Sequence, residues 1–149
     1  LIKDNTINSG YYGIRWNGPS SSTDYSTSSG NQFIGNTIQN WYYYGMYLYR
    51  GGSVTVKGNR SVQRQTGTFY TSSGYAYYLY YLTNGPEISY NYGWSSYMVF
   101  YAYYINYAYA STSNRAKVYN NMAAGSGTSN LYGMYLYNGQ YYDAAYNSV

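Results

Sequence analysis

The stretch Tyr44-Gly45-Met46-Tyr47-Leu48-Tyr49 returns, residue for residue, as Tyr132-Gly133-Met134-Tyr135-Leu136-Tyr137. An exact hexapeptide repeat within 149 residues indicates a repeat architecture. Weaker copies keep the pattern of a small residue, a large apolar residue, a variable residue and a second large apolar residue. They read Gly13-Ile14-Arg15-Trp16, Ala76-Tyr77-Tyr78-Leu79 and Ala102-Tyr103-Tyr104-Ile105.

A second phrase, an apolar residue followed three positions later by Asn, recurs in step with the first. Its anchor asparagines are Asn5, Asn36, Asn59, Asn91, Asn121 and Asn147. Successive anchors are 31, 23, 32, 30 and 26 residues apart, and a copy of the first phrase follows the anchor in every complete unit. This period of about 28 residues is typical of solenoid repeats with loops of variable length.

The pattern within each phrase predicts strands. Met46-Tyr47-Leu48-Tyr49 and Ser53-Val54-Thr55-Val56 alternate with period two, and Tyr, Val, Ile and Thr favour extended backbone. No window shows a sustained helical stripe, and Gly and Ser interrupt the chain frequently. We therefore predict an all-β fold, a parallel β-helix of about five to six coils.

Equivalent residues of neighbouring coils stack about 4.8 Å apart in such a fold. Amides in a column can donate and accept hydrogen bonds along the axis, so we expect the anchors to form an inward asparagine ladder. An Asn at a corner also tolerates the left-handed or bridge backbone that a sharp bend needs. Asn is common in this chain, but the apolar residue three positions before every anchor favours a structural role.

The alignment also predicts the core. Inward apolar columns are expected from Met46, Met134, Leu48, Leu79, Ile105 and Leu136, and from Ile2, Phe33, Val56, Ile88 and Val118. The glycine of the hexapeptide is expected at a turn. Tyr77 and Tyr103 share the inward register of the two Met residues. Because a buried Tyr needs a hydroxyl partner, we expect a bulge or a shifted register there.

Two outward columns contain most of the aligned tyrosines. One contains Arg15, Tyr47, Tyr78, Tyr104 and Tyr135, and the other contains Asn17, Tyr49, Tyr80, Asn106 and Tyr137. Stacked rings would shield backbone hydrogen bonds and stiffen the solenoid. A flat aromatic face could instead bind sugar rings, aromatic polymers or a neighbouring filament, and both roles are compatible. The seven tyrosines are the candidate interaction face. Electron hopping along them is conceivable, although no sequence feature supports it specifically.

Charged residues are few, at 8% of the chain, with a net charge of +4. The chain has no Cys and no His, which excludes disulfides and removes the commonest general base and metal ligand. Glu87, Lys117 and Asp143 align in one outward column as a charge-compensated ladder, a poor arrangement for a catalytic dyad. Asp24 lies in the Gly/Ser-rich loop 17–32, and Asp4 stands beside an anchor.

We interpret all four acids as structural or solubilising, and predict no catalytic, cofactor-binding or metal-binding residues and no cofactor. The basic residues form no run, so we expect no nucleic-acid partner. No apolar run approaches the roughly 20 residues of a membrane helix, so we expect no membrane insertion. The sequon at Asn59 falls on an inward anchor, where we expect no glycosylation.

Phe33-Ile34-Gly35-Asn36-Thr37-Ile38 and Val118-Tyr119-Asn120-Asn121-Met122 resemble repeats of the right-handed parallel β-helix family, the pectate-lyase-like superfold. Together with the hexapeptide and the closing Tyr146-Asn147-Ser148-Val149, they resemble large secreted surface proteins exported by the type IX route. The resemblance implies a right-handed β-helix over essentially the whole chain. It carries no catalytic residue onto this sequence.

We expect residues 1–149 to be a single solenoid segment of a longer repeat protein, because both ends fall in mid-phrase. The low charge and the abundant Ser, Thr, Asn and Tyr favour an extracellular or cell-surface location. The expected function is a non-enzymatic structural or adhesive element, with a surface filament as one form. Expected partners are further copies, neighbouring solenoid segments, polysaccharides or surface glycans. Two alternatives stay open: a segment of a carbohydrate-active β-helix whose catalytic coils lie elsewhere, and a virus-type fibre or tailspike shaft.

Overall fold

The chain winds around one axis in short strands. The computed structural model describes residues 1–19, 28–64, 73–95, 99–126 and 130–149. Each coil adds one strand to each of three parallel sheets, here called A, B and C. Within the described residues there are five complete coils, and β16 (Tyr142–Ala145) begins a sixth. Since crossovers between parallel strands are right-handed, this is the right-handed parallel β-helix predicted from the repeats.

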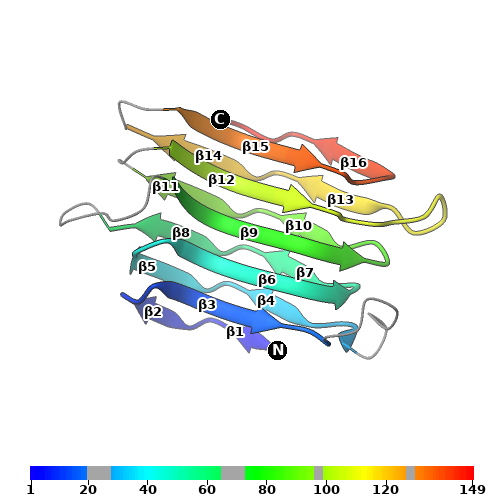
Figure 1. The fold of residues 1–149 in the computed structure, drawn as a ribbon, viewed down its shortest axis with the longest axis horizontal. Coiled ribbons are helices and arrows are strands. Elements are labelled where there is room, and N and C mark those ends of the chain that lie inside the picture. Colours follow the sequence, from blue (N-terminus) through cyan, green and yellow to red (C-terminus); the bar gives the residue numbers. More distant parts are fainter. Residues whose placement is uncertain (20–27, 65–72, 96–98, 127–129) are drawn as a thin grey trace.

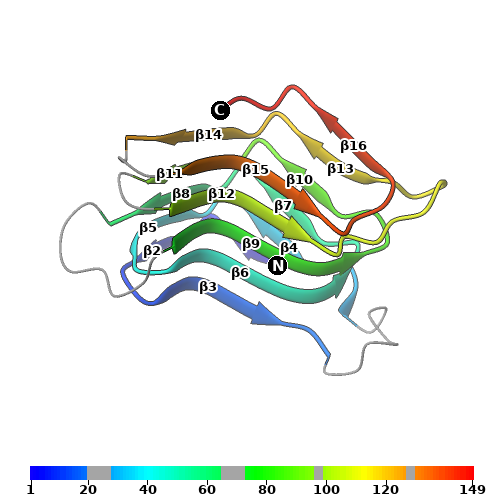
Figure 2. The same cartoon turned by 45° about the horizontal axis from the view of Figure 1, so that its top comes forward.

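Sheet A also contains β1 (Ile2–Lys3), β4 (Gln32–Ile34), β7 (Thr55–Lys57), β10 (Glu87–Ser89) and β13 (Ala116–Tyr119). Sheet B contains β2 (Thr6–Asn8), β5 (Thr37–Trp41), β8 (Arg60–Gln63), β11 (Tyr92–Ser95) and β14 (Met122–Gly125). Sheet C contains β3 (Tyr12–Asn17), β6 (Tyr44–Gly52), β9 (Ser73–Thr83), β12 (Val99–Asn106) and β15 (Leu131–Tyr137). Figure 1 shows the coils stacked in chain order, and Figure 2 shows the long strands of sheet C side by side.

Strand register follows the alignment of the two phrases. In sheet C, Met46 lies between Ile14 and Tyr77, so the third coil, to which Tyr77 belongs, keeps the predicted register. In sheet A, Val56 lies between Phe33 and Ile88. The side chains of Met46, Leu48, Leu79 and Ile105 are fully buried. Burying one such side chain stabilises the fold by roughly 1.5–3 kcal/mol.

Tyr77 and Tyr103 lie in the core without any bulge. Their rings stack with centroids 4.9 Å apart and parallel planes. The Tyr77 hydroxyl donates to the Asn59 carbonyl at 2.7 Å, and the Tyr103 hydroxyl donates to the Asn91 carbonyl at 2.6 Å. Both tyrosines pair in register with their neighbours. The expected bulge or register shift was therefore wrong, because carbonyls at the anchors supply the partners that the hydroxyls need.

The hexapeptide glycines lie inside strands rather than at turns, which corrects a second expectation. Gly45 is buried in β6, and Gly133 is buried in β15. A Cβ atom on Gly45 would lie 2.6 Å from the Ala76 carbonyl oxygen and would also clash with the Ser61 hydroxyl. The residue at this position must be small because sheets B and C converge there.

The bend between sheets A and B is made by the residue before each anchor. That residue has positive φ, between 52° and 64°, in all six units: Asp4, Gly35, Gly58, Tyr90, Asn120 and Tyr146. The anchor asparagines, which would tolerate this backbone, do not adopt it, because none of them has positive φ. A single left-handed residue changes the chain direction and leaves the following Asn free to turn inward.

The anchor amides form a continuous hydrogen-bonded ladder. Each Nδ2 donates to the Oδ1 of the next anchor at 2.9–3.0 Å, from Asn5 to Asn147. In the interior, the backbone N–H of Asn59 donates to the same Oδ1 of Asn91, and the Asn59 Nδ2 also donates to the Phe33 carbonyl. Both donors and both lone pairs of an interior amide are thus used. Asn59 is buried, which fits the expectation that its sequon is not glycosylated.

Candidate interaction surface

The outer face of sheet C carries two parallel columns of stacked phenol rings. We call these nine residues the tyrosine face. The first column is Tyr12, Tyr44, Tyr75, Tyr101 and Tyr132, and the second is Tyr47, Tyr78, Tyr104 and Tyr135. The strands of sheet C are long enough to present both columns, whereas most strands of sheets A and B are only two to four residues long.

The second column is the one predicted from the sequence. Its ring centroids are 5.1, 4.9 and 5.2 Å apart, and its ring planes differ by 3–13°. At its N-terminal end, the Arg15 guanidinium lies 5.9 Å from the Tyr47 ring centroid and 5.0 Å from that of Tyr12. The second column is therefore a stack of four tyrosines, and it ends in a cation–π contact with Arg15.

The first column was missed by the sequence alignment. Its centroids are 5.0, 5.3, 5.0 and 4.5 Å apart, with planes within 4–19° of parallel. The signal was present, because a Tyr precedes the small residue in all five copies of the first phrase. The alignment assumed that successive residues alternate strictly between the inner and outer faces, and this assumption hid the first column. Gly45 and Met46 both face inward, so Tyr44 and Tyr47 both face outward although they are three residues apart.

The two columns interlock edge to face. Tyr75 contacts Tyr78 and Tyr104 with centroids 5.3 and 5.6 Å apart and planes 85–90° apart. Tyr44 makes the same kind of contact with Tyr78 at 5.3 Å. Ring faces are therefore occupied by neighbouring rings, and the ring edges form the outer surface. This differs from the flat aromatic platform on which sugar rings would stack.

The other predicted column is interrupted. Tyr49 and Tyr80 lie 5.6 Å apart with planes 33° apart. Asn106 is buried in the next coil, and its Nδ2 donates to the Tyr104 hydroxyl at 3.1 Å. Tyr107 then contacts Tyr80 at 5.4 Å with a tilt of 68°. Tyr49 and Tyr80 therefore extend the tyrosine face sideways, and Tyr137 does so at the last coil, where it contacts Tyr135 at 5.9 Å.

The tyrosine face is uncharged. Burial raises the pKa of Tyr44, Tyr75 and Tyr78 above the ordinary value of 10.0, because it desolvates the phenolate, and neighbouring tyrosines raise it further. The same causes raise the pKa of Tyr80 to about 12. These four phenols therefore stay protonated well beyond neutral pH.

The charged residues of sheet A lie on a different outer face. Glu87, Lys117 and Asp143 pair in the predicted column. The ion pairs, however, run diagonally, with Lys57 Nζ 3.7 Å from Glu87 and Arg115 Nε 2.7 Å from Asp143. The predicted column is therefore confirmed, and the charge of Lys117 contributes to lowering the pKa of Glu87, although among the described residues Lys117 makes no ion pair within 4.0 Å.

The described carboxylates all contact basic or hydroxyl groups. Burial favours the protonated form of Glu87, but hydrogen bonds from Tyr119 and Ser89 and the charge of Lys57 outweigh this effect and lower its pKa. Asp4 lies 3.5 Å from Lys3. Asp24 lies outside the described residues. In the described ranges, no three His, Cys, Asp or Glu side chains gather to hold a metal ion, and no helix is long and apolar enough to span a membrane.

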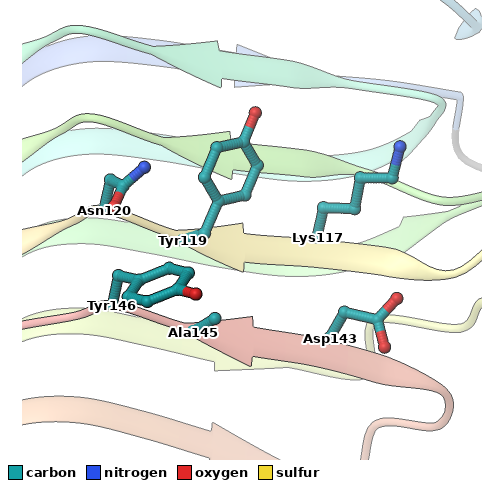
Figure 3. A pocket seen from close by; sticks show the side chains of 6 residues that line it. All are labelled: Lys117, Tyr119, Asn120, Asp143, Ala145 and Tyr146. Carbon is teal, nitrogen blue, oxygen red and sulfur yellow. The ribbon is translucent and has the colours of Figure 1, made fainter.

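A pocket of about 320 Å³ lies on sheet A at the last two coils. It is lined by Lys117, Tyr119, Asn120, Asp143, Ala145 and Tyr146. Figure 3 shows Lys117 and Asp143 on neighbouring strands, with the Tyr146 ring beside Ala145 and Tyr119 directed away towards the preceding coil. The small side chain of Ala145 leaves this space, because the equivalent position one coil earlier is Tyr119. The sequence alignment did not identify this pocket.

No protein-family model, curated protein or solved structure matches this chain. The parallel β-helix therefore rests on the strand pairing itself. Membership of the pectate-lyase-like superfold and the likeness to type IX-exported surface proteins stay predictions from short motifs.

Proposed function

We propose that this chain is a non-enzymatic structural and adhesive solenoid segment of a secreted or cell-surface protein. Its tyrosine face would contact a neighbouring solenoid segment or another copy, as in a surface filament. The observation that carries this proposal is the pair of interlocked ring columns on sheet C. An uncharged aromatic surface of this kind removes apolar area from water when it is covered, and Tyr is enriched at protein interfaces.

The rest of the molecule supports a rigid element. The asparagine ladder runs through every coil, and the described carboxylates are engaged in ion pairs and hydrogen bonds. Rings that stack on one another hold the outer surface in a fixed pattern as well. A partner would therefore meet a preorganised surface, which lowers the entropic cost of binding.

The test replaces Tyr47, Tyr78, Tyr104 and Tyr135 together with Ser and measures bundling by sedimentation and adhesion to coated surfaces. A matched control replaces the outward Thr55, Glu87, Lys117 and Asp143 of sheet A with Ser. We expect the sheet C variant to lose bundling and adhesion while the sheet A variant keeps them. Unchanged behaviour of the sheet C variant in both assays would reduce the tyrosines to a purely structural role.

Polysaccharide binding is a second candidate, and the pocket on sheet A is the observation that favours it. The Tyr146 ring could stack on a sugar, while Lys117 and Asp143 offer hydrogen bonds beside it. Titration with oligosaccharides of differing charge, followed by tyrosine fluorescence, would test this function. We expect Tyr146→Ala to abolish binding and Tyr90→Ala to preserve it. Equal binding by both variants would exclude this pocket as the oligosaccharide-binding site.

A further inference from the structure

The tyrosine face joins two solvent-exposed ends through unbroken ring contacts. At the first coil, Tyr11 is 47% exposed, and its ring centroid lies 5.0 Å from that of Tyr12. At the last coil, Tyr132 is 37% exposed and Tyr137 is 49% exposed. Between these ends, every ring in the first column is within 5.3 Å of the next. The path spans four coil intervals, or about 19 Å at the usual strand spacing.

The path is also duplicated. The second column has ring spacings of 4.9–5.2 Å. Diagonal contacts connect the two columns at Tyr44–Tyr78, Tyr75–Tyr104 and Tyr101–Tyr135, with centroids 5.3, 5.6 and 5.8 Å apart. If one column is interrupted, the ring contacts of the other column therefore remain continuous. Within these two columns, a block requires the removal of both phenol hydroxyls of one coil, and the third coil offers Tyr75 and Tyr78 for this purpose.

Phenols are among the protein side chains that lose one electron most readily, and electron exchange is fast between aromatic rings in contact. The chain contains no Cys, whose thiol would compete for oxidation. Met46 is fully buried beneath the face. We propose that the tyrosine face is a redox relay, which carries an oxidising equivalent from a one-electron oxidant at one end of the solenoid to the other. This activity is independent of the proposed adhesive function.

Each step conserves atoms and electrons. The oxidant takes one electron from an exposed phenol, and water takes the hydroxyl proton, which leaves a neutral tyrosyl radical. The next phenol gives an electron to that radical and its own proton to water, while the first oxygen regains a proton from water. The result is the same radical one ring further on. At the far end, a reductant or radical trap in solution consumes it.

Stacking also disfavours the competing reaction, in which two radicals couple. A carbon–carbon bond between two phenol rings would hold their Cβ atoms farther apart than paired residues on neighbouring strands, which lie about 4.8 Å apart. In-register neighbours within a column therefore exchange the radical without forming a covalent cross-link between their rings.

The absence of Cys allows a direct test. Ser9→Cys places a unique thiol on an exposed residue two positions before Tyr11, where a ruthenium polypyridyl photo-oxidant can be attached. After flash oxidation with a sacrificial electron acceptor and a water-soluble spin trap, peptide mass mapping locates the adducts. Tyr146 is an internal reference in the last strand region, because it is 85% exposed and has no ring contact among the described residues.

We expect adducts on Tyr132 and Tyr137 to exceed those on Tyr146 several-fold. The double variant Tyr75→Phe and Tyr78→Phe keeps the rings but removes the phenol hydroxyls. Adducts on Tyr132 and Tyr137 should therefore fall to the level of those on Tyr146. The control Tyr90→Phe and Tyr92→Phe makes the same change at the bend between sheets A and B and on sheet B, and it should leave the ratio of Tyr132 and Tyr137 adducts to Tyr146 adducts unchanged. Adducts confined to Tyr11 and Tyr12, a dominant Tyr146 adduct, or an unchanged ratio in the blocking variant would each overturn the relay.

Discussion

The asparagine ladder and the tyrosine face are both columns of one residue type repeated once per coil, but they differ in what holds them together. Inside, each interior amide uses its full hydrogen-bonding capacity at 2.8–3.1 Å. Outside, the phenols touch through ring contacts 4.5–5.3 Å apart, and their edges face solvent. Coil stacking thus produces one column that fixes the register and another that remains available to a partner. The ladder should be intolerant of single substitutions, and the face tolerant.

The largest effect is expected from removing one interior rung. Asn91→Ala removes the amide that donates to the Val56 carbonyl and the Oδ1 that accepts from the Asn59 backbone N–H, and it leaves the Asn59 Nδ2 with its carbonyl partners alone. Because each unsatisfied buried group costs about 1–3 kcal/mol, the free energy of unfolding should fall by about 3 kcal/mol or more. Asn5→Ala, at the exposed end of the ladder, is the matched control and should cost about 1 kcal/mol. Equal losses in urea denaturation would contradict a cooperative interior ladder.

The next comparison sets a buried tyrosine against an outer one. Tyr77→Phe removes a hydroxyl that donates to the Asn59 carbonyl at 2.7 Å, so stability should fall by about 2 kcal/mol. Tyr78→Phe, on the adjacent residue of the tyrosine face, keeps the stacked ring and should change stability little. The two variants differ by one residue in the same strand, and thermal or chemical unfolding would separate them. If Tyr78→Phe lowered stability more than Tyr77→Phe, the assignment of Tyr77 to the core and Tyr78 to the outer face would be wrong.

Removing an outer ring altogether measures the stacking itself. Tyr78→Ala loses its contacts with Tyr47 and Tyr104, each worth roughly 0.5–1.5 kcal/mol. A double-mutant cycle with Tyr104→Ala isolates the pair. Tyr146→Ala, which removes an exposed ring, is the control and should be neutral. A coupling energy indistinguishable from zero would show that the column adds no stiffness.

The smallest effect is expected on the charged face of sheet A. Because the pKa of Glu87 is lowered by folding, its contribution to stability is fully present above the ordinary pKa of 4.5 and is lost as pH falls through the lower folded value. Its ion pair with Lys57 is partly exposed, so the contribution should be below about 1 kcal/mol. Comparing wild type with Glu87→Gln between pH 7 and pH 3 would test this. A loss of stability only on raising the pH would contradict the direction of the shift.

The repeats predicted the architecture because stacking is periodic. The spacing of the Asn anchors placed the ladder residues in adjacent coils, and the hexapeptide placed Tyr47 and Tyr135 in one column. Strand pairing in sheets A and C follows from those two phrases. Tertiary contacts within one coil leave no such periodic signal.

Three features were missed, each for its own physical reason. The first tyrosine column was missed because two consecutive inward residues at Gly45 and Met46 break the alternation of a regular strand. The diagonal ion pairs of Glu87 and Asp143 depend on side-chain reach between neighbouring columns. The buried hydroxyl of Tyr103 was expected to distort its coil, but the partner carbonyl at Asn91 lies twelve residues away in the sequence and close in space.

The most direct test of the tyrosine face as an interaction surface is chemical footprinting. Hydroxyl radicals would oxidise accessible tyrosines in the monomeric chain and in the bundled or surface-bound form, and mass mapping would compare Tyr47, Tyr78 and Tyr104 with Tyr90 and Tyr119 of the sheet A side. We predict that association protects the first three and leaves the last two as reactive as before. Protection of Tyr90 and Tyr119, with the tyrosine face still oxidised as in the monomer, would contradict the account.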